Sequence, residues 1–153
     1  MVRLADIPEP ERTVIADLDC PAYEDTPPVK PPSPAERHVA IVSTAGFILR
    51  GERPMLSNET GYRAIEADVE DGDILCSHVS TNFDRTGFQQ DVNVMLPRER
   101  LLELEREGSI CKAADRHYAF MGATSPLKLE DKARELGRSM LALGVNTVVL
   151  APV

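Results

Sequence analysis

The sequence predicts a single three-layer α/β domain with a mainly parallel sheet of the flavodoxin or Rossmann type. Three observations predict it: short β-branched runs typical of buried strands, amphipathic helical segments between them, and a length of 153 residues, which suits one compact core. We expect this domain over 38–153. Residues 1–37 form a leader so rich in proline that we expect irregular chain, without a long helix or a central strand.

Five segments have the composition of strands. Residues 38–44 are apolar and β-branched, which predicts a buried parallel strand that leads into a loop. Alternation over 62–67 predicts a strand nearer an edge, with one wetter face. Residues 73–79 and 116–121 predict two more strands, and 145–151 predicts a central strand reached by a right-handed crossover.

Two segments predict helices that cover the sheet. In 97–107 a leucine-rich side faces one way and Gly108 ends the pattern. In 125–144 the apolar residues follow a four-three-four-three spacing that Gly144 ends. Since a doubly wound sheet returns a helix after each inner strand and the sequence stops at Val153, we expect the last helix to be missing.

Composition excludes several classes of function. A net charge of −8 disfavours nucleic acid and anionic membranes as partners. No apolar run approaches the ~20 residues of a membrane-spanning helix, and the N-terminus lacks a basic segment followed by an apolar one. Three widely spaced cysteines, Cys20, Cys76 and Cys111, are typical of reduced thiols. We therefore expect a cytoplasmic protein.

The densest group of polar side chains follows the predicted strand at 73–79. In residues 77–93, His78 can exchange a proton near neutral pH, and Arg85 can clamp a carboxylate. Either Asp84 or Asp91 can orient an imidazole or pair with an ammonium group. This inventory suits an amino acid as ligand. Polar residues of these types also satisfy turn backbone, and on composition alone the two interpretations are about even.

Two further positions are candidates. His117 begins an aromatic run that is mostly core, yet a polar residue at the end of a strand can also face a ligand crevice. Ser43 and Thr44 offer hydroxyl groups at the tip of the first strand. No metal site is predicted, because no ligand spacing is diagnostic, and the absence of a glycine-rich phosphate loop disfavours a flavin or phosphate binder.

Four segments resemble the selenoprotein B family of glycine, sarcosine and betaine reductases, together with the related D-proline reductase subunit and shorter bacterial relatives. They are residues 39–46, 77–93, 116–122 and 148–153, of which 77–93 is unusually specific. The resemblance covers 38–153 and leaves the leader outside.

The resemblance implies reductive cleavage of a carbon–nitrogen bond in a small amino acid, an oxidoreductase reaction with a disulfide as acceptor. A selenocysteine or cysteine attacks the α-carbon, and a selenolate suits this task because it is ionised at neutral pH and polarizable. No cofactor is implied in this chain. A pyruvoyl group on a partner subunit and a dithiol electron donor are implied instead.

The resemblance implies that Ser80, Asn82, Asp84 and Arg85 line the crevice beside the nucleophile and that His78 and His117 are candidate proton donors, although the family motif does not by itself assign an acid or a base. The candidate catalytic residues are therefore His78, Asp84 and His117. The candidate substrate-binding residues are Ser80, Asn82 and Arg85, with Ser43 and Thr44 added for their hydroxyl groups at the strand tip. The nucleophile of such relatives would follow Val153 directly, and selenocysteine is encoded by a codon otherwise read as stop. We therefore expect the given chain to be inactive. The alternative is a non-catalytic subunit that binds a small ligand or assists assembly, which needs no nucleophile.

Overall fold

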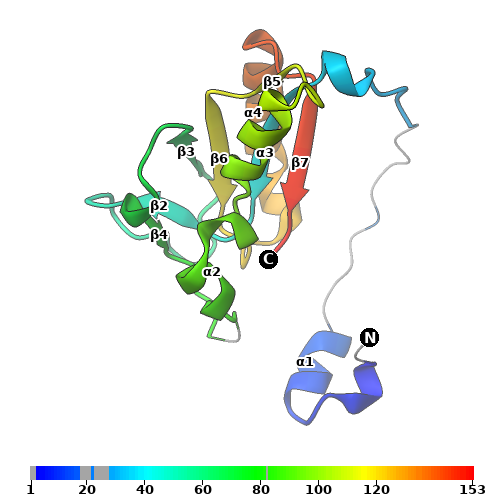
Figure 1. The fold of residues 1–153 in the computed structure, drawn as a ribbon. Coiled ribbons are helices and arrows are strands. Elements are labelled where there is room, and N and C mark those ends of the chain that lie inside the picture. Colours follow the sequence, from blue (N-terminus) through cyan, green and yellow to red (C-terminus); the bar gives the residue numbers. More distant parts are fainter. Residues whose placement is uncertain (1–2, 18–21, 23–27, 82) are drawn as a thin grey trace.

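The computed structural model describes residues 3–17, 22, 28–81 and 83–153 (Figure 1). The N-terminal part contains a 3-10 turn at Leu4–Asp6 and a short helix, α1 (Glu11–Ala16), and a second 3-10 turn at Pro34–Glu36 precedes the first strand. The prolines therefore allow one short helix in the leader. Cys20 lies outside the described residues.

The main sheet is built around β1 (His38–Ser43). Parallel to it run β7 (Thr147–Ala151), β6 (Arg116–Phe120) and the two-residue β5 (Lys112–Ala113), while β3 (Tyr62–Glu66) is antiparallel to β6. The predicted α/β domain with a mainly parallel sheet is confirmed, and β3 lies at the predicted edge.

One edge of β1 is shared by two strands in succession. β5 pairs with the start of β1, at His38 and Val39, and β6 pairs with its end, at Val42 and Ser43. Since β7 occupies the other edge of β1 from Val39 to Ser43, β5 and β6 follow one another along the same side. The ladder is therefore interrupted opposite the middle of β1.

Helices cover both faces of this sheet (Figure 1). Helix α3 (Arg98–Arg106) contributes Leu101 to a core cluster that includes Ile41 of β1. Helix α4 (Pro126–Ala142) contributes Leu136 and Met140 to a separate cluster that includes Tyr118 of β6. The two predicted helices therefore form the outer layers of a three-layer domain.

A second, two-stranded sheet lies beside the first. It consists of β2 (Phe47–Leu49) and β4 (Ile74–Cys76), which run antiparallel. The strand predicted over 73–79 exists as β4, but it does not join the parallel sheet. Strand β2 is not predicted from the sequence, because only three residues separate it from β1 and the reversal of the chain depends on Gly46 at φ 65°. Helix α2 (Thr86–Gln90) follows β4.

Strand β7 lies at an edge. Among the described residues it pairs with β1 alone, and Val148, Val149 and Leu150 are 38, 38 and 72% exposed. The prediction of a central strand is therefore wrong for the part of the chain described, because apolar residues on both faces of a strand indicate burial without supplying the covering elements. No helix among the described residues is long and apolar enough to cross a membrane.

Candidate functional site

Three chain segments meet at the carboxyl ends of β1 and β6. The Gly122 amide donates to the Thr44 carbonyl at 2.9 Å, and the Gly46 amide donates to the Phe120 carbonyl, also at 2.9 Å. The Ser77 amide donates to the Gly46 carbonyl at 3.0 Å, which brings the exit of β4 to the same place.

We name the resulting group the strand-tip corner: Thr44, Gly46, His78 and Gly122. Two of its members are glycines because the backbones approach too closely for a side chain. A Cβ at Gly122 would lie 2.6 Å from the Thr44 oxygen and 3.1 Å from His78 Nε2. A Cβ at Gly46 would lie 3.3 Å from the His78 backbone. The open ends of parallel strands are where α/β domains commonly bind ligands.

His78 is the buried imidazole of the strand-tip corner, at 7% exposure. Its Nδ1 accepts a hydrogen bond from the Ser80 amide at 3.2 Å, so the neutral ring carries its proton on Nε2. Nε2 is buried and has no hydrogen-bond partner among the described residues. Burial, and then the charge of Arg85, lowers the pKa of His78. At neutral pH the ring is therefore an uncharged donor without an acceptor.

Arg85 organises the loop that carries His78. Its guanidinium donates to the carbonyl oxygens of His78, Ser80 and Phe83. It also lies 5.4 Å from the Phe83 ring centroid, and the Phe83 ring is in turn 4.5 Å from the His78 ring. Arg85, predicted to clamp a ligand carboxylate, is thus bonded in this structure to the loop carbonyls of His78, Ser80 and Phe83.

The Thr44 hydroxyl connects the strand-tip corner to the chain after β7. The Val153 amide donates to Thr44 Oγ1 at 2.9 Å, and Oγ1 is 3.4 Å from the Val153 carbonyl oxygen. The Thr44 amide donates to the Ala151 carbonyl at 3.2 Å. These bonds hold the main chain beyond β7 against the tip of β1.

Other residues predicted for the site have local structural partners. The Ser43 side chain is fully buried and accepts from the Ala45 amide at 3.2 Å. Asp84 is exposed and accepts from the Thr86 amide at 2.9 Å, at the start of α2. Hydrogen bonds from the Thr86 side chain and then its backbone lower the pKa of Asp84. Asn82 lies outside the described residues, so its predicted role stays a prediction.

His117 lies in the core and not at the strand-tip corner. It is 1% exposed, and its Nδ1 accepts from the Ile41 amide at 3.2 Å. Ile41 lies where the ladder between β1 and its β5–β6 neighbours is interrupted, so the imidazole replaces a missing carbonyl acceptor. Burial, and then the charge of Arg98, lowers the pKa of His117 to about 4. The expectation that it faces the crevice fails because its side chain completes the sheet.

Gly122 is the member of the corner whose importance the sequence does not reveal. A glycine directly after an apolar strand is a weak signal by itself. Its role follows only from the clash that a Cβ would make with Thr44 and His78. Within the described residues, no three His, Cys, Asp or Glu side chains are grouped as metal ligands.

The comparisons with known proteins agree on one family. The sequence profile described as Glycine/sarcosine/betaine reductase selenoprotein B (GRDB) matches residues 11–153. The chain is 29% identical over 146 residues to the D-proline reductase subunit gamma of Acetoanaerobium sticklandii, covering 90% of this chain and 60% of that protein. No solved structure matches the chain significantly.

Two glycine reductase complex component B gamma subunits are also similar. That of Symbiobacterium thermophilum is 30% identical over 129 residues, with 81% of this chain and 30% of that protein covered. That of Carboxydothermus hydrogenoformans is 26% identical over 142 residues, with 88% and 32% covered. The chain thus spans between about a third and three fifths of the curated relatives it matches. By the match over 11–153, the chain belongs to the glycine/sarcosine/betaine reductase selenoprotein B family.

Proposed function

We propose that this chain forms the substrate-facing part of a selenol- or thiol-dependent amino-acid reductase of the glycine, sarcosine, betaine or D-proline type. Its family and the names of its relatives, which are subunits of D-proline reductase and of glycine reductase complexes, support the class. The observation that carries the proposal is the bonding of Thr44 to Val153, because it fixes the main chain beyond β7 at the strand-tip corner.

The reactive atom in this proposal is a selenium or sulfur that follows Val153. A residue at that place would extend from the corner formed by Thr44, Gly122 and His78. This is the end of the sheet where α/β domains commonly bind ligands. In this proposal a dithiol would supply the two electrons that cleave the carbon–nitrogen bond and would become a disulfide, and a pyruvoyl group on a partner subunit would supply the activation of the substrate amino group. A chain that ends before the reactive atom would be inactive.

His78 serves in this proposal as an uncharged hydrogen-bond donor. Its unpaired Nε2–H can stabilise an anionic atom, such as a substrate carboxylate oxygen or a selenolate, and a donor of this kind is strong where water is excluded. Its lowered pKa argues against an imidazolium at neutral pH. Because Nε2 is buried in this structure, contact with a ligand requires the groups around it to move.

The gene provides the first test. We expect the codon after Val153 to be UGA, or a cysteine codon, with an open frame that continues into an amphipathic helix. Mass spectrometry of the purified protein then checks whether the longer product is made. An ordinary stop codon there would contradict the proposal and favour the non-catalytic binding or assembly subunit.

The second test measures turnover of the longer protein with its partner subunits and a dithiol. We expect Thr44→Val to lower kcat by about tenfold or more, because the valine keeps the shape of the side chain but cannot hold the chain at 153. Ser43→Ala is the matched control, since within the described part of the chain that hydroxyl bonds to the Ala45 amide and not to the chain after β7. Equal turnover in the two variants would contradict the proposed position of the reactive residue.

A further inference from the structure

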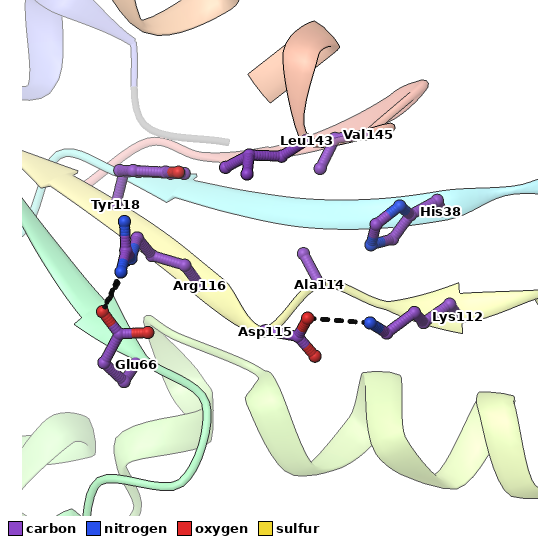
Figure 2. Close-up of a pocket in the computed structure, with 9 residues that line it drawn as sticks. All are labelled: His38, Glu66, Lys112, Ala114, Asp115, Arg116, Tyr118, Leu143 and Val145. Carbon is purple, nitrogen blue, oxygen red and sulfur yellow. Dashed lines mark hydrogen bonds and ion pairs between the residues drawn. The ribbon is translucent and has the colours of Figure 1, made fainter. Parts of the chain in front are cut away.

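A cavity of about 270 Å³ opens at the amino ends of β1 and β6, which is the end of the sheet opposite the strand-tip corner (Figure 2). One wall is the 112–116 segment, where β5 passes into β6. The other is the connection between α4 and β7, which contributes Leu143 and Val145. The domain therefore has a concave site that the proposed function does not use.

Two ion pairs flank this cavity. Lys112 Nζ lies 2.8 Å from Asp115 Oδ2, and Arg116 Nη2 lies 2.5 Å from Glu66 Oε1. Figure 2 shows the pairs on two sides of the same space. All four side chains are more than two fifths exposed, so their charges remain open to a ligand. Two cations and two anions make the charge of the lining zero.

Two polar groups in the lining lack partners. Tyr118 is 3% exposed, and its hydroxyl has no hydrogen bond to any described residue; in Figure 2 it points toward Leu143. His38 Nε2 is buried and also has no partner in the described part of the chain. Buried polar atoms are nearly always hydrogen-bonded, so the unpaired Nε2 of His38 beside this cavity indicates a missing partner.

The apolar part of the lining is small. Ala114, Leu143 and Val145 form it, and in Figure 2 the latter two lie together across from the ion pairs. A ligand that matches this lining has a short aliphatic part on one side and balanced charges on the other. A simple anion or cation would match only one of the two kinds of charge in this lining.

We propose that this cavity binds a small zwitterionic amino acid. Its carboxylate would lie against Arg116 and the Tyr118 hydroxyl, its ammonium group against Asp115, and its aliphatic side chain against Leu143 and Val145. The site is distinct from the strand-tip corner. The inference stands on the geometry of the amino ends of the strands, whether or not the proposed function is correct.

The test is an NMR titration of the 153-residue chain with glycine, L-alanine, L-proline and D-proline. We expect saturable shifts of the amides of His38, Asp115 and Tyr118, with a dissociation constant of about 1 mM or lower for at least one of them. Propionate and ethylammonium, which carry one charge each, should bind at least tenfold more weakly.

Two variants and a control locate the ligand. Tyr118→Phe keeps the buried ring and should weaken binding about fivefold or more, and Arg116→Gln should weaken it at least tenfold. Arg100→Gln removes an arginine that is also paired with glutamates, but on α3, and should leave binding unchanged. The amide spectra of all three variants report whether they fold.

Three outcomes would overturn the inference. They are an absence of shifts in the millimolar range, shifts confined to Thr44, His78 and Gly122, and binding that is unaffected in both folded cavity variants. The second outcome would move the ligand to the strand-tip corner and so support the proposed function while removing this site.

Discussion

The two buried histidines of this domain look alike in the sequence and differ in the structure. His117 completes the sheet, because its Nδ1 accepts the Ile41 amide where the strand ladder is interrupted. His78 lies at the strand-tip corner, where Nδ1 is occupied by the Ser80 amide and Nε2 has no partner among the described residues. Burial lowers the pKa of both.

The difference separates a structural role from a functional one. A buried imidazole whose hydrogen bond replaces backbone pairing contributes to stability through that bond. A buried imidazole with an unpaired N–H costs stability, and functional sites are where such costs are commonly found. The comparison therefore predicts opposite outcomes when each region is changed.

The largest expected effect is a loss of stability on acidification, caused by His117. Its pKa is about 4 in the folded protein against 6.5 unfolded, so between these values the unfolded state binds the extra proton. The free energy of unfolding should fall by roughly 3 kcal/mol as the pH decreases from 7 to 4, with the full stability present above pH 6.5. Urea denaturation across this range measures it.

His117→Asn is the control, because its amide oxygen can still accept from the Ile41 amide but does not titrate. The free energy of unfolding of this variant should fall much less between pH 7 and pH 4 than that of the wild type, because most of the fall in the wild type comes from His117. If the free energy of unfolding falls equally in both proteins on acidification, His117 is not the cause of the pH dependence.

The second effect is the loss of close packing at the strand-tip corner. Gly122→Ala should destabilise the protein by about 2 kcal/mol, because its Cβ would meet the Thr44 carbonyl oxygen at 2.6 Å. Gly137→Ala, in α4 with open space around it, should instead raise stability by up to about 1 kcal/mol. Thermal or urea unfolding of the two variants gives the comparison, and equal effects would contradict the tight corner.

Neighbouring hydroxyls at the tip of β1 give a smaller contrast. Ser43→Ala leaves the buried Ala45 amide without its acceptor and should cost about 1–2 kcal/mol of stability. Thr44→Val should cost about 0.5 kcal/mol, because water can replace its partner at the exposed end of the chain. Urea unfolding measures both losses of stability. A larger loss in Thr44→Val than in Ser43→Ala would mean that the Thr44 hydroxyl, and not that of Ser43, has the structural role.

The smallest effect is expected at Asp84. Asp84→Asn keeps an oxygen that can accept from the Thr86 amide, so neither stability nor turnover should change measurably. Turnover of the longer enzyme and its melting temperature check this. A large fall in kcat with unchanged stability would restore the catalytic role that the resemblance implies for this carboxylate.

Elements with strong periodicity were predictable from the sequence. The helix at 125–144 appears as α4, and the apolar run at 38–44 appears as β1, because their patterns reflect the faces they bury. The position of β7 was not predictable. Its pattern indicates burial on both faces, but pairing partners depend on elements that a local pattern does not contain.

The candidate site was predictable as a region and not as a set of roles. The resemblance and the polar composition of 77–93 both indicated the loop that holds His78. They did not distinguish His78 from His117, because the surroundings of each ring include chain far away in sequence: Gly122 lies close to His78 Nε2, and the Ile41 amide donates to His117. The chemistry of Arg85 likewise indicated a clamp for a carboxylate, but its bond to the His78 carbonyl in the loop is not evident from the sequence.

The most direct test of the strand-tip corner is the turnover of the longer, assembled reductase with His78→Ala beside His117→Asn, each at equal concentrations of folded protein. We predict that His78→Ala lowers kcat by about 100-fold, the usual effect of removing a preorganised donor, and that His117→Asn keeps kcat within a few-fold of wild type. A His78→Ala enzyme that turns over at the wild-type rate would contradict the account.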